Sequence, residues 1–176
     1  LDLESLGGFK EVGGVHYRTD HDLGGHQLGS GEKLEVTIDE NGKIKNFIPH
    51  VLELSFGVDR NILALLDLFY KEEKERTLFA FPPYLSPIDA AIFPLVNRDK
   101  LPEISEKIFL DLFKSGFTVF FDDSGSIGRR YRRQDEVGTM YTLTVDYDSL
   151  KRNDLTIRHR DTMKQIRVKI KDLPQV

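Results

Sequence analysis

The pattern of apolar and polar residues changes near residue 70. Before that point, "LEVTID" (34–39) alternates apolar and polar positions, and the Asn-Gly pair in "ENGK" (40–43) predicts an antiparallel hairpin. Apolar residues continue through "HVLELSF" (50–56), which predicts a strand, and from Ile62 to Tyr70 they follow helical spacing. This first module, a strand, hairpin, strand and helix, is too small to form a complete core.

After residue 77, predicted strands and helices alternate. The patterns indicate strands at 88–93, 117–122, 141–146 and 156–161, and helices at 101–116, 126–138 and 162–173. We therefore expect an α/β sandwich with a mixed, mainly parallel sheet. The charged segment "KEEKER" (71–76) contains no apolar residue, and it is the predicted boundary between a first domain, 1–70, and a second domain, 77–176.

Composition limits the class of protein. The chain has 176 residues, of which 39% are apolar, enough for one ordinary domain or two small ones. The absence of cysteine excludes disulfides and thiolate metal sites. No apolar run has the length of a membrane span, and no signal peptide is visible, so we expect a cytoplasmic protein. The methionines are Met140 and Met163, so we expect Leu1 to be an internal cut or the first ordered residue.

Charge is distributed unevenly. Residues 1–70 carry 6 Lys and Arg against 12 Asp and Glu, whereas residues 77–176 carry 16 against 14. Within the second part, residues 150–171 hold eight basic and two acidic residues, and 129–133 read "RRYRR". This asymmetry suggests two modules with different ligands.

The stretch "ELSFGVDR" (53–60) places polar groups in an apolar strand. Alternation puts Glu53 and Ser55 on one face, about 7 Å apart, where they suit a small cation such as an ammonium group. Arg60 falls in the first turn of the next helix, where a bound anion such as a phosphate would stabilise it. An ordinary half-exposed strand with a surface arginine and Asp59 as helix cap accounts for the same residues. The opposite face, expected in the core, carries Leu52, Leu54 and Phe56.

Four segments together resemble a known family. "EVGGVHYRTDHDLGGH" (11–26), "PHVLELSFGVDR" (49–60), "DDSGSIGRRYRRQDEVG" (122–138) and "RHRDTMKQIRV" (158–168) are similar, in order and spacing, to the C-terminal part of the dimeric glycyl-tRNA synthetases. "ELSFGVDR" resembles motif 3 of the class II aminoacyl-tRNA synthetases. The resemblance implies a remnant of the antiparallel catalytic sheet, followed by an α/β anticodon-binding domain.

The resemblance also implies roles for single residues. Glu53 and Ser55 match residues that hold the ammonium group of the amino acid, and Arg60 matches an arginine that stacks on adenine and contacts the triphosphate. Arg18 and Asp20 would line the same site. Leu54 stands where many relatives carry proline. The implied substrate-binding residues are Glu53, Leu54, Ser55, Phe56 and Gly57; the implied ATP-binding residues are Glu11, Val12, Gly57, Val58, Asp59 and Arg60, with Glu11 also a candidate Mg²⁺ ligand.

The implied reaction is the ATP-dependent activation of glycine to glycyl-adenylate and its transfer to tRNA-Gly, with Glu53, Ser55, Arg60 and Arg18 as catalytic residues and a homodimer as the complete enzyme. Class II motifs 1 and 2 are not visible in the sequence, so we expect this polypeptide alone to form no adenylate. The alternative is a non-catalytic, synthetase-like nucleic-acid-binding or accessory protein. The joint presence of Glu11, Glu53, Ser55 and Arg60 favours the ligase.

The predicted helix 126–138 is the candidate RNA contact. Arginines can neutralise phosphates and an aromatic ring can stack on an unpaired base, while a solvated face paired with the nearby acids, Asp122 and Asp123 among them, is the simpler interpretation. The resemblance favours contact with the tRNA anticodon loop. The candidate residues are Arg129, Arg130, Tyr131, Arg132 and Arg133.

Three other features receive simpler interpretations. His16, His21 and His26 recur every five residues, which places them on no common face, so we interpret them as loop histidines and not metal ligands. The glycine-rich segment 24–31 lacks the lysine of a P-loop and is expected to be a flexible connection. Residues 67–76 are expected to be a solvated helix end.

Overall fold

The computed structural model describes residues 1–175, and the chain divides into two compact units, Leu1–Leu68 and Phe69–Val176. The division lies a few residues before the boundary expected at 71–76. No helix among the described residues is long and apolar enough to cross a membrane.

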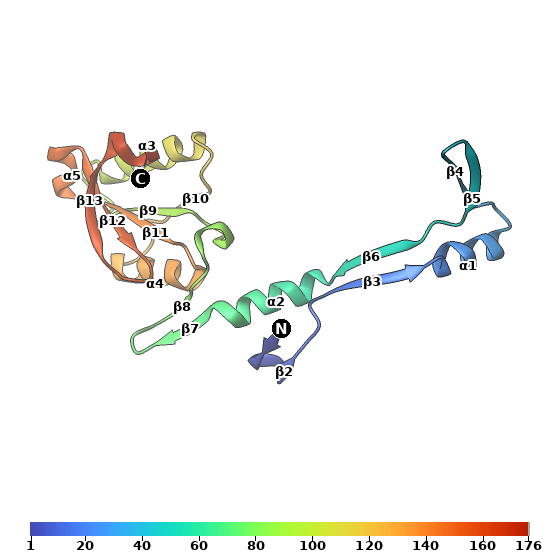
Figure 1. The fold of residues 1–176 in the computed structure, drawn as a ribbon. Coiled ribbons are helices and arrows are strands. Elements are labelled where there is room, and N and C mark those ends of the chain that lie inside the picture. The colour runs from blue at the N-terminus through green and yellow to red at the C-terminus, as the bar shows by residue number, and fades with distance from the viewer. Residues whose placement is uncertain (176) are drawn as a thin grey trace. The chain divides into compact units, whose positions relative to one another are not determined.

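The first unit consists of short strands, a 3-10 turn and two helices. Its antiparallel pairs are β1 with β2, β3 with β6, and β4 with β5 (Figure 1). The elements are β1 (Asp2–Leu3), η1 (Glu4–Leu6), β2 (Gly8–Phe9), β3 (Gly13–Thr19), α1 (His21–Ser30), β4 (Val36–Glu40), β5 (Lys43–Phe47), β6 (Val51–Phe56) and α2 (Val58–Phe69).

The predicted hairpin is confirmed as β4 and β5. Asn41 and Gly42 have φ values of 57° and 80°, which is the left-handed conformation that a two-residue hairpin turn requires. The Gly42 N–H donates to the Asp39 carboxylate at 2.7 Å. The glycine-rich segment 24–31, in contrast, is not a flexible connection: most of it belongs to α1, which ends where Gly31 adopts φ 76°.

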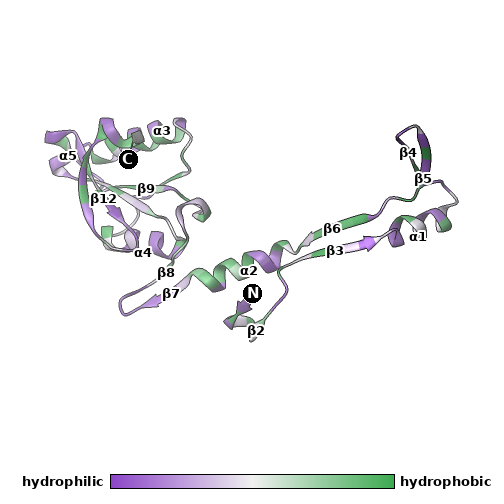
Figure 2. Cartoon of the chain, in the orientation of Figure 1, coloured by the Kyte–Doolittle hydropathy of each residue, from purple (hydrophilic) through white to green (hydrophobic). Residues whose placement is uncertain are grey.

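The predicted strand 50–56 is confirmed as β6, and its side chains alternate as expected. The expectation that its apolar face is core is wrong, however, because Leu52, Leu54 and Phe56 are 64–67% exposed. Val15 and Tyr17 of β3, which pair with Leu54 and Leu52, are equally exposed. In the described residues this sheet has two strands, and the face that carries these apolar side chains is open to solvent. Figure 2 shows the hydrophobic residues of β6.

The second unit is a five-stranded mixed sheet with helices, which confirms the α/β fold class. The strand order is β10-β9-β11-β12-β13. β9 is parallel to both of its neighbours, while β12 is antiparallel to both of its own, so parallel pairs do not dominate. The elements are β7 (Tyr70–Glu73), β8 (Arg76–Phe79), η2 (Pro83–Leu85), β9 (Ala90–Pro94), α3 (Leu101–Lys114), β10 (Val119–Phe121), α4 (Ile127–Val137), β11 (Tyr141–Val145), α5 (Tyr147–Arg152), β12 (Asp154–His159), β13 (Gln165–Lys169) and η3 (Ile170–Gln175).

The core of the second unit lies between the sheet and α3. Because apolar residues recur every three or four positions along α3, one face of the helix packs on the strands. α4 lies on the opposite side of the sheet (Figure 1), where it also contacts β8. The buried cluster comprises Ile92, Leu101, Ile108, Leu112, Leu143, Val145, Leu155 and Ile157.

Three local predictions are wrong in this unit. Residues 67–76 were expected to be a solvated helix end that contains the domain boundary, but from Tyr70 onward the chain forms the hairpin β7–β8, Tyr70–Phe79. Residues 165–169, expected to be helical, form β13 because Ile166 and Val168 alternate with polar residues and pair with β12. Residues 147–152, expected to be a loop, form α5, which Asp146 and Ser149 begin with a reciprocal capping box.

Candidate functional site

A cluster of charged side chains lies on the polar face of the β3–β6 sheet. In the antiparallel register, Ser55 is opposite Gly14 and Glu53 is opposite His16, so these residues share one face. The register shifts between Tyr17 and Thr19, and such a bulge re-aims the side chain within it. That residue is Arg18, whose guanidinium lies beside Glu53.

Arg18 is shared by two carboxylates. Its Nε is 3.3 Å from Glu53 Oε2, and its Nε and Nη2 donate to Asp22 at 2.5 and 2.7 Å. The bonded guanidinium lowers the pKa of Asp22. One cation and two carboxylates give a net charge of −1, so the cluster can accept a further cation such as an ammonium group. Glu53 and Ser55 thus share one face, as alternation predicts, and the cation beside Glu53 is Arg18; the roles of these residues in binding a substrate stay a prediction.

A second set of contacts fixes the beginning of α2. Arg60 Nη1 donates to the backbone carbonyl of Glu11 at 2.7 Å. Asn61 Nδ2 donates to the carbonyls of Val12 and Gly57 at 2.7 and 2.9 Å. These bonds hold the beginning of α2 against residues 11–12, so Arg60 and Glu11, both predicted to bind ATP, lie side by side.

Not all of the predicted residues lie together. Leu54 and Phe56 point to the face opposite Glu53 and Ser55 and are exposed, so their side chains do not line the charged cluster. Asp20 precedes α1 and makes no side-chain cap to it. Val58 is 71% exposed at the start of α2.

Three contributing residues were missed from the sequence. Asp22 holds Arg18, His16 faces the same way as Glu53, and Asn61 anchors α2. Arg18 and Asp22 are four residues apart, but Arg18 lies at the end of a strand and Asp22 at the beginning of a helix. Neither the helical nor the strand period therefore predicts that they meet. His16 could have been found, because a residue opposite Glu53 in an antiparallel register shares its face.

The candidate Mg²⁺ ligand Glu11 belongs to no larger group of metal-ligating side chains among the described residues. Among residues 1–175, no group of three or more His, Cys, Asp or Glu is placed to hold a metal ion. The assignment of Glu11 as a Mg²⁺ ligand therefore stays a prediction. The interpretation of His16, His21 and His26 as loop histidines is wrong, because His16 lies in β3 and His21 and His26 lie in α1.

The outward face of α4 carries the candidate RNA contacts of the second unit. Arg129 and Arg133 are exposed and Arg132 is half-buried. They line a groove of about 550 Å³ together with Ser126, Gly128 and Glu136. Arg133 donates to Asp122 at 2.6 Å, and Arg132 lies 3.3 Å from Asp135. These acids fix the two guanidiniums at the rim of the groove.

Two of the five predicted RNA contacts make bonds within the domain. Arg130 is 3% exposed, and its guanidinium donates to the carbonyls of Pro94 and Gly125; burial lowers its pKa. Tyr131 bonds Thr144 through its hydroxyl at 2.7 Å and packs edge-on against Phe93. Arg130 does not face solvent, because residues 130 and 134 lie on the inner face of the helix.

A buried ionic cluster ties α4 to its neighbours. Asp135 is fully buried and accepts from Arg158 at 2.8 and 3.0 Å and from Arg76 at 3.1 Å. The Arg158 guanidinium also lies 5.1 Å from the centre of the Tyr131 ring. Removing one member of such a cluster leaves buried charge without a partner, which costs about 3–5 kcal/mol. The cluster therefore holds the hairpin, helix and sheet in one arrangement.

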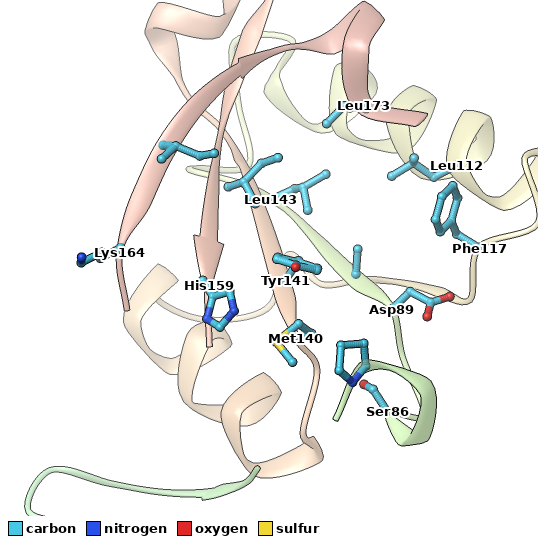
Figure 3. Close-up of a pocket in the computed structure, with 14 residues that line it drawn as sticks. Ser86, Asp89, Leu112, Phe117, Met140, Tyr141, Leu143, His159, Lys164 and Leu173 are labelled. Carbon is cyan, nitrogen blue, oxygen red and sulfur yellow. The ribbon is translucent and has the colours of Figure 1, made fainter. Parts of the chain in front are cut away.

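An apolar pocket of about 310 Å³ lies on the α3 side of the sheet (Figure 3). Leu112 and Phe117 approach it from α3 and the following turn, and Tyr141 and His159 from the strands. The amino group of Lys164 points away from the other lining side chains. The pocket suits an apolar group and offers no cluster of cations for a phosphate.

Comparison with known proteins agrees with these features. Residues 89–176 match the family model of the anticodon binding domain. The chain is 43% identical over 171 residues to a glycine–tRNA ligase of Borrelia hermsii, covering 94% of this chain and 38% of that protein. It is 43% identical over 177 residues to a glycine–tRNA ligase of Treponema denticola, covering 96% and 39%. The chain thus spans somewhat more than a third of the length of these relatives.

Solved structures show the same fold at lower identity. The RNA binding domain of threonyl-tRNA synthetase from Cryptosporidium parvum aligns with a TM-score of 0.59 and 21% identity, covering 81% of this chain and 34% of that chain. Prolyl-tRNA synthetase from the same organism aligns with a TM-score of 0.51 and 20% identity, covering 55% and 21%. With the family match to its second unit and the resemblance of both units to the ligases, the chain belongs to the anticodon-binding-domain family and is homologous to the C-terminal region of glycine–tRNA ligases.

Proposed function

We propose that this chain is the C-terminal part of a cytoplasmic glycine–tRNA ligase. In this proposal the first unit supplies one side of the site for glycine and ATP, and the second unit binds the anticodon loop of tRNA-Gly. The observation that carries the proposal is the shared face of β3 and β6, where Glu53, Ser55 and Arg18 lie together in a chain homologous to such ligases over almost its whole length.

The charges of the first unit fit the two substrates. The cluster of Arg18, Asp22 and Glu53 is negative overall and would attract the ammonium group of glycine. Arg60, held against the Glu11 carbonyl, would offer positive charge to the nucleotide phosphates at the beginning of α2, where the helix dipole also favours an anion.

Catalysis in this proposal comes from binding and orientation. The carboxylate of glycine attacks the α-phosphate of ATP, and pyrophosphate leaves. A ribose hydroxyl of the tRNA terminus then attacks the carbonyl of glycyl-adenylate, which forms the ester and releases AMP. No side chain forms a bond to the substrate. The residues of this chain hold the two reactants close together and offset their charges.

The second unit would contact RNA through the groove over α4. Arg129, Arg132 and Arg133 present guanidiniums at its rim, and arginine binds phosphates and base edges with paired donors. A contact to a base should discriminate between anticodons, whereas a contact to a phosphate should not. Arg130 and Tyr131 would support this surface from inside the domain.

Binding of the anticodon can be tested with the chain as it is. We expect fluorescence anisotropy to show tighter binding of the anticodon stem-loop of tRNA-Gly than of the same stem-loop with a different anticodon, by about 1–3 kcal/mol for each base contacted. Arg129→Ala should weaken binding, while Lys100→Ala, a change at an exposed residue before α3, should not. Equal affinity for both stem-loops would contradict the proposal.

A further inference from the structure

The basic stretch at residues 150–171 is not explained by the groove over α4. The structure divides its eight cationic residues into two groups. Arg158 and Arg160 are buried, and Arg167 makes ion pairs with Asp146 and Asp154 at 2.8 and 2.7 Å. The remaining five residues are exposed, although Lys169 also lies 3.8 Å from Asp154: Lys151, Arg152, Lys164, Lys169 and Lys171.

Three of the exposed residues come together with a lysine of α3. Arg152, Lys169, Lys171 and Lys107 line a groove of about 560 Å³ between α3, the end of α5 and the end of β13. Asp111 is the acidic residue among its lining groups, so the lining carries a net charge of +3. Its apolar lining residues are Ile104, Ile108 and Ile170. We call this surface the basic groove.

Hydrogen bonds fix the walls of the basic groove. Asn153 ends α5 in the left-handed conformation, with its N–H bonded to the Ser149 carbonyl at 3.0 Å. The Ile170 N–H donates to the Asn153 carbonyl at 3.0 Å, and Lys169 Nζ donates to the Arg152 carbonyl at 2.7 Å. These bonds join the end of α5 to the end of β13, so the cations from different elements are held along one groove.

The chemistry of the basic groove suits a phosphate backbone. Three of its four cations are lysines, which act as flexible point charges toward phosphate oxygens, and contacts to phosphates carry no sequence information. The isoleucine floor offers apolar contact to the sugars between them. The groove lies on the α3 side of the sheet, whereas the groove over α4 lies on the opposite side (Figure 1).

We propose that the basic groove binds the sugar-phosphate backbone of RNA, independently of sequence, at a place separate from the groove over α4. This inference rests on the proposed function, in which the second unit binds tRNA. The basic groove adds affinity for the body of the RNA, and the groove over α4 supplies discrimination between anticodons.

A pair of matched double variants tests the basic groove. Lys107→Gln/Lys171→Gln removes two charges from it, and Lys114→Gln/Lys164→Gln removes two charges from exposed lysines outside it. Binding of a full-length tRNA-Gly transcript is measured by anisotropy across a series of salt concentrations. The slope of log K against log salt should fall by about 1 to 2 in the first variant, because each lost phosphate contact removes about 0.9. The second variant should keep the wild-type slope.

The outcomes separate the two proposals. If the first variant loses affinity equally for tRNA-Gly and for a transcript with a changed anticodon, the basic groove is supported even where anticodon discrimination fails. If both double variants bind alike while the wild-type chain discriminates between anticodons, the basic groove is overturned and the proposed function stands. If the wild-type chain binds neither transcript, the basic groove is overturned. Binding of an acidic peptide is measured in the same way; if the first variant loses binding of this peptide but keeps binding of RNA, the basic groove is also overturned.

Discussion

The carboxylate of Glu53 has a cation beside it in the structure, and this pairing determines what its removal should do. Arg18 lies between Glu53 and Asp22, so Glu53→Gln leaves Arg18 with one carboxylate and changes the net charge of the cluster from −1 to 0. A neutral cluster no longer attracts an ammonium group. Removing the charge of Glu53 should therefore weaken the binding of glycine and have little effect on the binding of ATP.

A chimera makes this measurable. We would join this chain to the N-terminal part of the Treponema denticola ligase, in place of the region that it matches, and measure glycine-dependent exchange of pyrophosphate into ATP. Glu53→Gln should raise the KM for glycine about 10- to 100-fold, as expected for loss of a charged hydrogen bond of about 1.5–3 kcal/mol. The KM for ATP should change little.

Two controls accompany the chimera. Glu40→Gln removes the same charge from the exposed end of β4 and should leave both constants unchanged. The 176-residue chain alone is expected to show no exchange. Equal increases in the KM for glycine and for ATP would mean that Glu53 does not bind the ammonium group.

At the scale of single elements, the beginning of α5 shows how charge and capping act together. Asp146 accepts from the Ser149 N–H at 3.0 Å and from both Nη atoms of Arg167 at 2.8 and 2.9 Å. These bonds, the ones from Arg167 above all, lower the pKa of Asp146 to about 2. The ionised form is therefore more favourable in the folded than in the unfolded chain.

The sign of the pH effect follows from that shift. A carboxyl group whose pKa is lowered by folding stabilises the fold above its unfolded pKa, near 4, and loses this contribution as the pH falls toward 2. We expect Asp146 to contribute roughly 1–2 kcal/mol at neutral pH after allowance for its partial exposure. Urea unfolding of Asp146→Asn should show a smaller loss of stability between pH 4 and pH 2 than the wild-type chain shows.

Asp148→Asn is the matched control, because Asp148 lies exposed in the first turn of the same helix. Its stability should fall with pH as that of the wild-type chain does. If the stability of Asp146→Asn depends on pH as that of the wild-type chain does, the contact between Arg167 and Asp146 is not maintained in solution.

The elements also show how far the sequence predicts the fold. The Asn-Gly hairpin, β6, α2, α3 and α4 follow from turn residues and periodicity, which are local. The hairpin β7–β8 could not be predicted in the same way, because its arms are held by contacts far along the chain, such as Arg76 with Asp135 of α4. Two errors were avoidable: Ile166 and Val168 alternate with polar residues, and Asp146 with Ser149 is a capping pattern.

The candidate site was predictable to a similar degree. Alternation alone places Glu53 and Ser55 on one face, as the register with β3 confirms. The bulge that brings Arg18 to Glu53, and the turn of α4 that buries Arg130, depend on backbone geometry and on partners distant in sequence. Arginine-rich runs of this kind predict a basic helix, but not which guanidiniums face inward.

At the scale of the whole molecule, the two units differ in how much apolar surface they bury. Among the described residues, Leu3 and Ala64 are the buried hydrophobic residues of the first unit, and the other buried hydrophobic residues belong to the second. Because burial of apolar side chains is the main stabilising term, most of the cooperative stability should belong to residues 69–176.

Calorimetry can test this distribution. Small domains unfold with an enthalpy of about 0.7 kcal/mol per residue near 60 °C, so a transition confined to residues 69–176 should absorb about 75 kcal/mol, whereas cooperative unfolding of all 176 residues should absorb about 120 kcal/mol. We expect the lower value, and the same Tm for residues 69–176 produced alone. A single transition near the higher value would show that the first unit, despite its open β3–β6 face, is stabilised together with the second.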